Sequence, residues 1–133
     1  MSWTTFHRRG EVLREVIAAV EGRRDCRLPM HLPGVGDAFG DELTLLGALQ
    51  LRWHTRLAGR IERELMQCPH DHEAAVVAAW RSTARELPGV RALLDHYRDH
   101  PLDERMARAV ATSSRKEQAL LGASAGRVPE NAA

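Results

Sequence analysis

The sequence predicts an all-α protein: a single-domain antiparallel four-helix bundle whose third helix is kinked near Pro88. Apolar residues recur every three or four positions through most of the 133-residue chain, and no strand-like alternation of useful length occurs. This length suits one domain with one core. Four amphipathic segments with mostly short connections favour a bundle over residues 1–122, followed by a flexible tail over residues 123–133.

The first predicted helix covers residues 3–22. Ser2 is placed to cap its N-terminus, and Gly22 is placed to end it. Its apolar face is formed by Phe6, Leu13, Val16, Ile17 and Val20. The connection over residues 23–37 contains Pro and Gly and is longer than most helix–helix connections, so the order of the helices in the bundle stays open.

The second predicted helix covers residues 38–66, with Asp37 as its expected N-cap. At 1.5 Å per residue it is roughly 40 Å long, which makes it the expected spine of the fold. Its apolar stripe is formed by Phe39, Leu43, Leu46, Trp53, Leu57, Ile61 and Leu65.

The third predicted helix covers residues 72–100, with Asp71 as its cap after the break at Pro69. Pro88 and Gly89 interrupt its apolar face, so a kink or two short helices are expected there. The fourth predicted helix covers residues 102–122 and begins after Pro101. Its apolar stripe is formed by Leu102, Met106, Val110, Leu120 and Leu121.

Composition and charge narrow the classes of function. The net charge of +1 indicates no polyanionic partner, and an arginine stripe on the second helix is expected to pair with Glu11 and Glu15 rather than to bind nucleic acid. There is no apolar run near the ~20 residues that span a bilayer, and no secretory pattern. Two cysteines are too few for a disulfide framework, so a cytoplasmic protein without membrane contact is expected.

Two polar residues interrupt the apolar stripes, Gln50 on the second helix and Glu117 on the fourth, and His54 lies beside the stripe of the second helix at a depth similar to that of Glu117. A buried carboxylate must be paired or neutralised, and His54 is its expected neighbour. The predicted internal polar layer comprises Gln50, His54, Thr83, Glu117 and His7. Such a layer either fixes the register of the helices or binds a metal or a small ligand.

A second set of candidates lies at one end of the predicted bundle. His96 and His100 are spaced i, i+4, and Cys26 and His31 lie on the long connection that reaches the same end. Four such ligands suit a metal ion. The sequence predicts no cofactor from a motif, and zinc or iron are the metals considered. Cys68 to Glu73, CPHDHE, is interpreted as a helix stop followed by a helix cap.

The pattern as a whole favours a small helical protein that acts through protein–protein interaction, as a regulatory or accessory factor. A protein partner or a homo-oligomer is expected. No nucleophile elbow, phosphate-binding loop or dinucleotide fingerprint is present, and we interpret the chain as non-enzymatic, with catalysis left open. The alternative is a bundle that binds a metal or small ligand at the internal polar layer. An exposed tryptophan would mark a partner surface.

Overall fold

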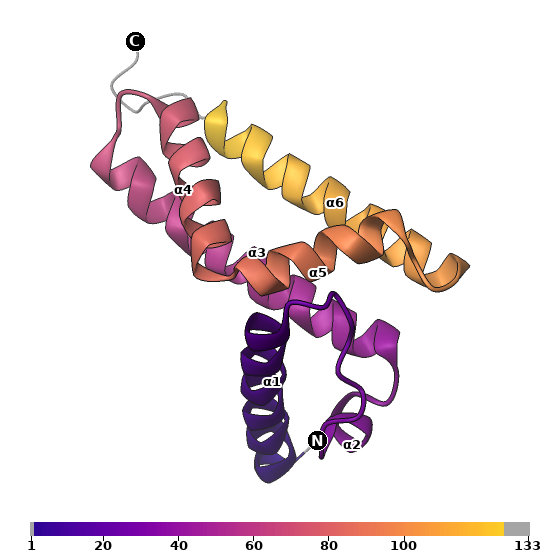
Figure 1. Cartoon of the computed structure of the whole chain (residues 1–133). Coiled ribbons are helices and arrows are strands. Elements are labelled where there is room, and N and C mark those ends of the chain that lie inside the picture. Colours follow the sequence, from indigo (N-terminus) through magenta and orange to yellow (C-terminus); the bar gives the residue numbers. More distant parts are fainter. Residues whose placement is uncertain (1, 127–133) are drawn as a thin grey trace.

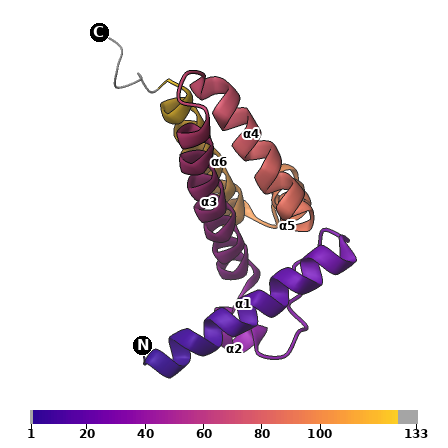
Figure 2. The ribbon, with the colours of Figure 1, turned by 90° about the vertical axis from the view of Figure 1, so that its left-hand side faces the viewer.

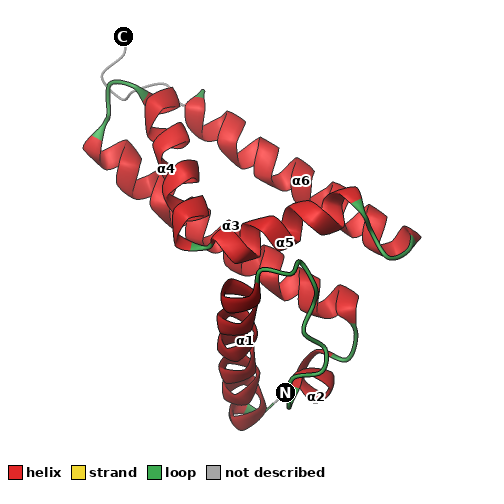
Figure 3. Cartoon of the chain, in the orientation of Figure 1, coloured by secondary structure: helices red, strands yellow, loops and turns green. Residues whose placement is uncertain are grey.

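The computed structural model describes residues 2–126, and all regular secondary structure in that range is helical (Figure 3). The helices are α1 (Trp3–Arg23), α2 (Val35–Phe39), α3 (Glu42–Gln67), α4 (His72–Glu86), α5 (Pro88–Asp99) and α6 (Glu104–Ala125). The predicted all-α class is therefore confirmed. Within the same range, no helix combines the length and apolar character needed to cross a bilayer.

Side-chain caps define most of the helix starts. Ser2, Asp71 and Asp103 each accept a hydrogen bond from the backbone N–H three residues later, at the starts of α1, α4 and α6. The predicted caps Ser2 and Asp71 are thus confirmed. The predicted cap Asp37 is wrong, because residues 35–39 form the separate helix α2. Gly40 ends α2 with a φ of 82°, and Asp41 caps α3.

Helix α3 is the spine of the molecule, as expected. It packs against α2, α4, α5 and α6. One face is buried along its whole length, through Leu45, Leu46, Leu49, Trp53, Leu57, Ile61 and Leu65. In Figures 1 and 2, α4 and α6 lie alongside α3. The core is one apolar cluster around the buried face of α3, and every helix from α1 to α6 contributes to it.

The predicted third helix is two helices. The chain bends at Leu87, and Pro88 starts α5 in a new direction (Figure 1). Leu87 supplies no side-chain cap for α5. The Glu21 carboxylate of α1 takes that role, because it accepts hydrogen bonds from the backbone N–H groups of Gly89 and Val90 at 2.9 Å and 2.7 Å.

The position of α1 differs from the expected bundle. It packs mainly against α5 and α2, and it crosses α3 steeply instead of lying alongside it (Figures 1 and 2). The predicted alternation of four antiparallel helices is therefore not confirmed, and three helices flank one another where four were expected. The N-terminal turns of α1 extend beyond the body formed by α3, α4 and α6 (Figure 2).

Two further expectations concern the connections and the C-terminus. The long connection is packed against the core, since Leu28 and Pro29 are buried and the Leu28 N–H donates to the Tyr97 hydroxyl at 3.4 Å. The predicted tail begins too early, because α6 continues to Ala125 and buries Ser124. Residues 127–133, the rest of that predicted tail, lie outside the described residues.

Candidate functional site

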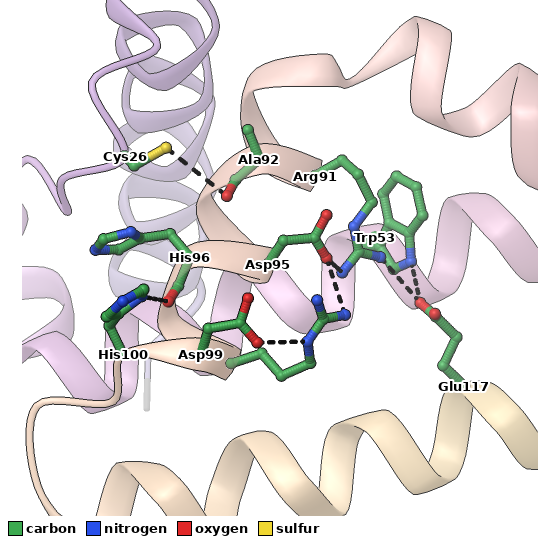
Figure 4. Close-up of polar contacts among 10 residues, drawn as sticks. Cys26, Trp53, Arg91, Ala92, Asp95, His96, Asp99, His100 and Glu117 are labelled. Carbon is green, nitrogen blue, oxygen red and sulfur yellow. Dashed lines mark hydrogen bonds and ion pairs between the residues drawn. The ribbon is translucent and has the colours of Figure 1, made fainter.

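The Glu117 carboxylate of α6 is a partly buried group with partners on two other helices. It accepts a hydrogen bond from the Trp53 indole N–H of α3. It also accepts one from the Arg91 guanidinium of α5 at 3.1 Å (Figure 4). These contacts join three helices at one point. The prediction that Glu117 needs a partner inside the bundle is confirmed, but the partners are Arg91 and Trp53 and not His54.

Arg91 contacts two tryptophan rings and two carboxylates. Its guanidinium lies over the ring of Trp53, 4.5 Å from the ring centre, and over the ring of Trp80 at 6.0 Å. It donates to the Asp95 carboxylate at 2.7 Å, one turn along α5. The side chains of Arg91 and Glu117 are only 14% and 23% exposed, so their ion pair is largely shielded from water. The Arg91 Nε atom is buried without a hydrogen-bond partner.

Of the other members of the predicted polar layer, only Gln50 lines a pocket together with Glu117 among the described residues. Thr83 is buried, but its hydroxyl donates to the Ala79 carbonyl of its own helix. Gln50 and Glu117 line one open pocket of about 100 Å³. Gln50 and His54 line a neighbouring groove of about 310 Å³ between α3 and α6. The layer is thus split between two depressions that share Gln50.

His7 does not belong to this layer, which corrects the prediction. It is exposed on α1, where its ring stacks on Trp3 at 5.1 Å and its Nε2 lies 3.4 Å from Glu11. Glu11 was expected to pair with the arginine stripe of α3. Arg56 pairs with Glu86 instead, and Arg60 lies 3.3 Å from Glu64. Both differences follow from the steep crossing of α1, which removes it from the neighbourhood assumed for a bundle.

The predicted metal ligands have separate contacts. The Cys26 thiol points at the Ala92 carbonyl at 3.8 Å, while His31 lies 3.2 Å from Arg23. The rings of His96 and His100 stack at 5.0 Å, and His100 Nδ1 lies 3.3 Å from the His96 carbonyl (Figure 4). Over residues 2–126, no three or more His, Cys, Asp or Glu side chains are arranged to hold a metal ion. His96 and His100 do lie together, although α5 ends at Asp99 and His100 is its C-cap residue, but the four ligands do not converge.

The largest exposed aromatic side chains lie together on α1. Trp3 is 76% exposed and Phe6, one turn later, is 69% exposed. Phe6 was expected on the buried face of the first helix, and that expectation is wrong. The face that α1 buries is centred on Val12, Val16 and Val20 instead. We call Trp3, Phe6, Gly10 and Leu13 the α1 seam, because their spacing of three, four and three residues places them along one line of the helix.

Sequence reasoning missed two functional groups. Arg91 is the cation that neutralises Glu117. Nothing in the sequence distinguishes it from an exposed arginine in the first turns of a helix. Glu21 caps a helix 68 residues away in sequence. The absence of a capping side chain before Pro88 was the one local indication that a distant acceptor was needed.

Comparison with protein-family models, with curated proteins and with solved structures gives no match.

Proposed function

We propose that the protein acts by binding a protein chain through the α1 seam, as a regulatory or accessory factor in the cytoplasm. The observation that carries this proposal is the exposure of Trp3 and Phe6 on neighbouring turns of one helix. Burial of each side chain is worth about 1.5–3 kcal/mol, so both are placed where contact with a partner is strongly favourable. Tryptophan is also the residue most enriched among side chains that dominate binding energy.

The position of the seam supports the same proposal. The N-terminal turns of α1 extend from the body of the molecule (Figure 2), and α2 packs on a different side of α1, where Gly34 approaches Val12 and Arg9 lies over Phe39. Among the described residues, no two of the other large exposed apolar side chains lie on neighbouring turns of one helix. They are Leu51 and Met66 on α3, Val77 on α4, and Leu102 before α6.

The test is affinity capture from the native host with the full chain, a Trp3→Ala/Phe6→Ala variant and a Met66→Ala control. Met66 is 81% exposed on α3, so its replacement removes an exposed apolar side chain without touching α1. We expect the control to retain the wild-type partner and the double variant to lose it. The captured protein is then bound in purified form to the same three chains. A partner retained equally by all three would contradict the proposal.

The alternative function, binding of a metal or small ligand beside Glu117, has one observation in its favour. The pocket of about 100 Å³ is lined by polar groups, among them Gln50, Ser113 and Ser114. Two points weigh against it: the carboxylate already accepts from Trp53 and Arg91, and ligand pockets usually hold about 300 Å³ or more. Elemental analysis beside a Glu117→Gln variant tests it. Stoichiometric zinc or iron that is lost in the variant would favour the alternative.

A further inference from the structure

The α1 seam has the pattern of a two-helix interface. Trp3, Phe6, Gly10 and Leu13 follow the spacing of alternating core positions in a coiled coil, where every such position contacts the facing helix. The fold leaves the first half of this line without a facing helix, because α1 turns its Val12, Val16 and Val20 face inward. The unpaired part of the seam therefore consists of Trp3 and Phe6 in the first two turns of α1, whereas Leu13 is partly buried against the core.

Gly10 indicates how closely a facing helix approaches. A glycine in the interior of a helix costs about 1 kcal/mol relative to alanine. Nothing within this chain requires it, since a Cβ atom added at Gly10 would meet only the Arg14 guanidinium, at 4.0 Å. A second helix packed closely against α1 would explain a glycine at this position, because the absent side chain leaves a gap that a large side chain of that helix fills.

We infer that a second copy of this chain covers the α1 seam, with the two α1 helices antiparallel. In that orientation, pairing Phe6 of one copy with Gly10 of the other also pairs Trp3 with Leu13, and both pairs occur twice. Large aromatic side chains then face small or aliphatic positions along the whole contact. The pairing uses the same surface on both copies and closes as a dimer, whereas a head-to-tail contact would continue into a fibre. This inference rests on the proposed function and names its partner.

The area of the seam sets the strength of the dimer. Aromatic side chains of this size bury roughly 150–250 Å² each. With Trp3 and Phe6 mostly exposed, the aromatic side chains of two copies contribute roughly 600 Å², and the surfaces that they cover bring the total near the lower limit of about 1,200 Å² for specific interfaces. A reversible dimer in the micromolar range is therefore expected. The extension of α1 from the body allows two such helices to cross while the bodies stay apart (Figure 2).

Sedimentation velocity of the full chain from about 1 to 200 µM tests the inference. The wild-type chain is expected to pass from monomer to dimer. Phe6→Ala and Gly10→Leu should each weaken the dimer at least about tenfold, which is about 1.4 kcal/mol. Gly10→Leu is the decisive variant, because it raises helix propensity and its Cβ atom would meet only the flexible Arg14 side chain, at 4.0 Å, so it should fold as well as wild type by thermal unfolding. Met66→Ala should leave the dimer unchanged.

The double variant Phe6→Ala/Gly10→Leu tests the pairing itself. It exchanges the large and small positions, so it should regain part of the dimer that each single change removes. A chain that stays monomeric over the whole concentration range overturns the inference, as does a dimer indifferent to both single variants or a double variant with no recovery. A monomer that still captures a different protein through Trp3 and Phe6 would overturn this inference alone and leave the proposed function standing.

Discussion

At the scale of single residues, the ion pair between Glu117 and Arg91 joins α6 to α5 in a partly buried position. Neither charge is fully exposed, and each has further partners: Trp53 donates to Glu117, and Asp95 accepts from Arg91. A shielded pair of this kind adds little beyond what well-packed apolar residues would give, but removal of one member leaves an uncompensated charge. The pair is therefore sensitive to single changes, even though its net contribution is modest.

Replacing Glu117 should destabilise the fold, and the loss should be smaller when the new side chain still accepts a hydrogen bond from Arg91 or Trp53. Glu117→Ala removes the oxygen that accepts the hydrogen bonds from both Arg91 and Trp53, and we expect a loss of roughly 2–3 kcal/mol in the free energy of unfolding. Glu117→Gln keeps an oxygen for the Trp53 N–H and should lose about half as much. Urea unfolding measures both values. The control is Asp99→Asn, an exposed partner of Arg98, which should change stability by under about 0.5 kcal/mol. Equal stability of all three variants would show that the pair does not matter.

The acid sensitivity of α3 should depend on Asp41. The hydroxyl and the backbone N–H of Thr44 both donate to this carboxylate and lower its pKa below the ordinary value of about 4. Since the folded-state pKa is the lower one, the cap stabilises the fold fully above the unfolded pKa and loses this effect as the pH falls through the folded pKa. Melting temperatures from pH 7 to pH 3 should fall less for Asp41→Asn, which caps without titrating, than for wild type. Parallel curves for the two chains would be contrary to this expectation.

At the scale of helices, the junction between α1 and α5 fixes the direction of both. α5 has no capping side chain of its own, so its first N–H groups depend on the Glu21 carboxylate of α1. The contact requires the two backbones to approach closely. A Cβ atom at Gly89 would lie 2.6 Å from the Val20 carbonyl oxygen and 2.8 Å from the Glu21 Cα atom. Gly89 is therefore required by packing between helices and not by its own backbone angles.

Substitution of two glycines by alanine should have opposite effects. Gly89→Ala forces α1 and α5 apart and should cost roughly 1–3 kcal/mol, because the neighbouring atoms belong to the backbone and cannot rotate away. Gly59→Ala on α3 meets nothing within 4 Å and should stabilise the chain by about 0.5–1 kcal/mol through helix propensity. Chemical unfolding of the two variants in parallel provides the comparison. A stabilising Gly89→Ala would show that the α1–α5 contact can adapt.

At the scale of the whole molecule, α3 carries the core, because the other main helices pack on it or on one another around its buried face. Leu57→Ala, in the middle of that face, should cost about 2–5 kcal/mol and lower the melting temperature clearly. Leu51→Ala lies on the same helix but points to solvent, and it should change stability by less than about 0.5 kcal/mol. Similar losses from both changes would mean that α3 is covered on both sides in solution.

Much of the fold follows from the sequence. The helical class, the caps Ser2 and Asp71, the break near Pro88 and the stripe of α3 from Leu46 to Leu65 were all predicted correctly, because each depends on residues within a few turns of one another. The need of Glu117 for a partner was also predicted, since a carboxylate in an apolar stripe cannot be left alone. These features are local or follow from the chemistry of one group.

The tertiary structure decided the rest. The identity of the Glu117 partners, the use of Glu21 as a cap for α5 and the exposure of Trp3 and Phe6 all depend on where α1 and α5 lie relative to α3. The periodicity of α1 allows either of two adjoining apolar faces to be buried, and the sequence does not choose between them. In the folded chain the close contact at Gly89 holds α1 against α5, and in this position α1 buries Val12, Val16 and Val20 and leaves Trp3 and Phe6 exposed.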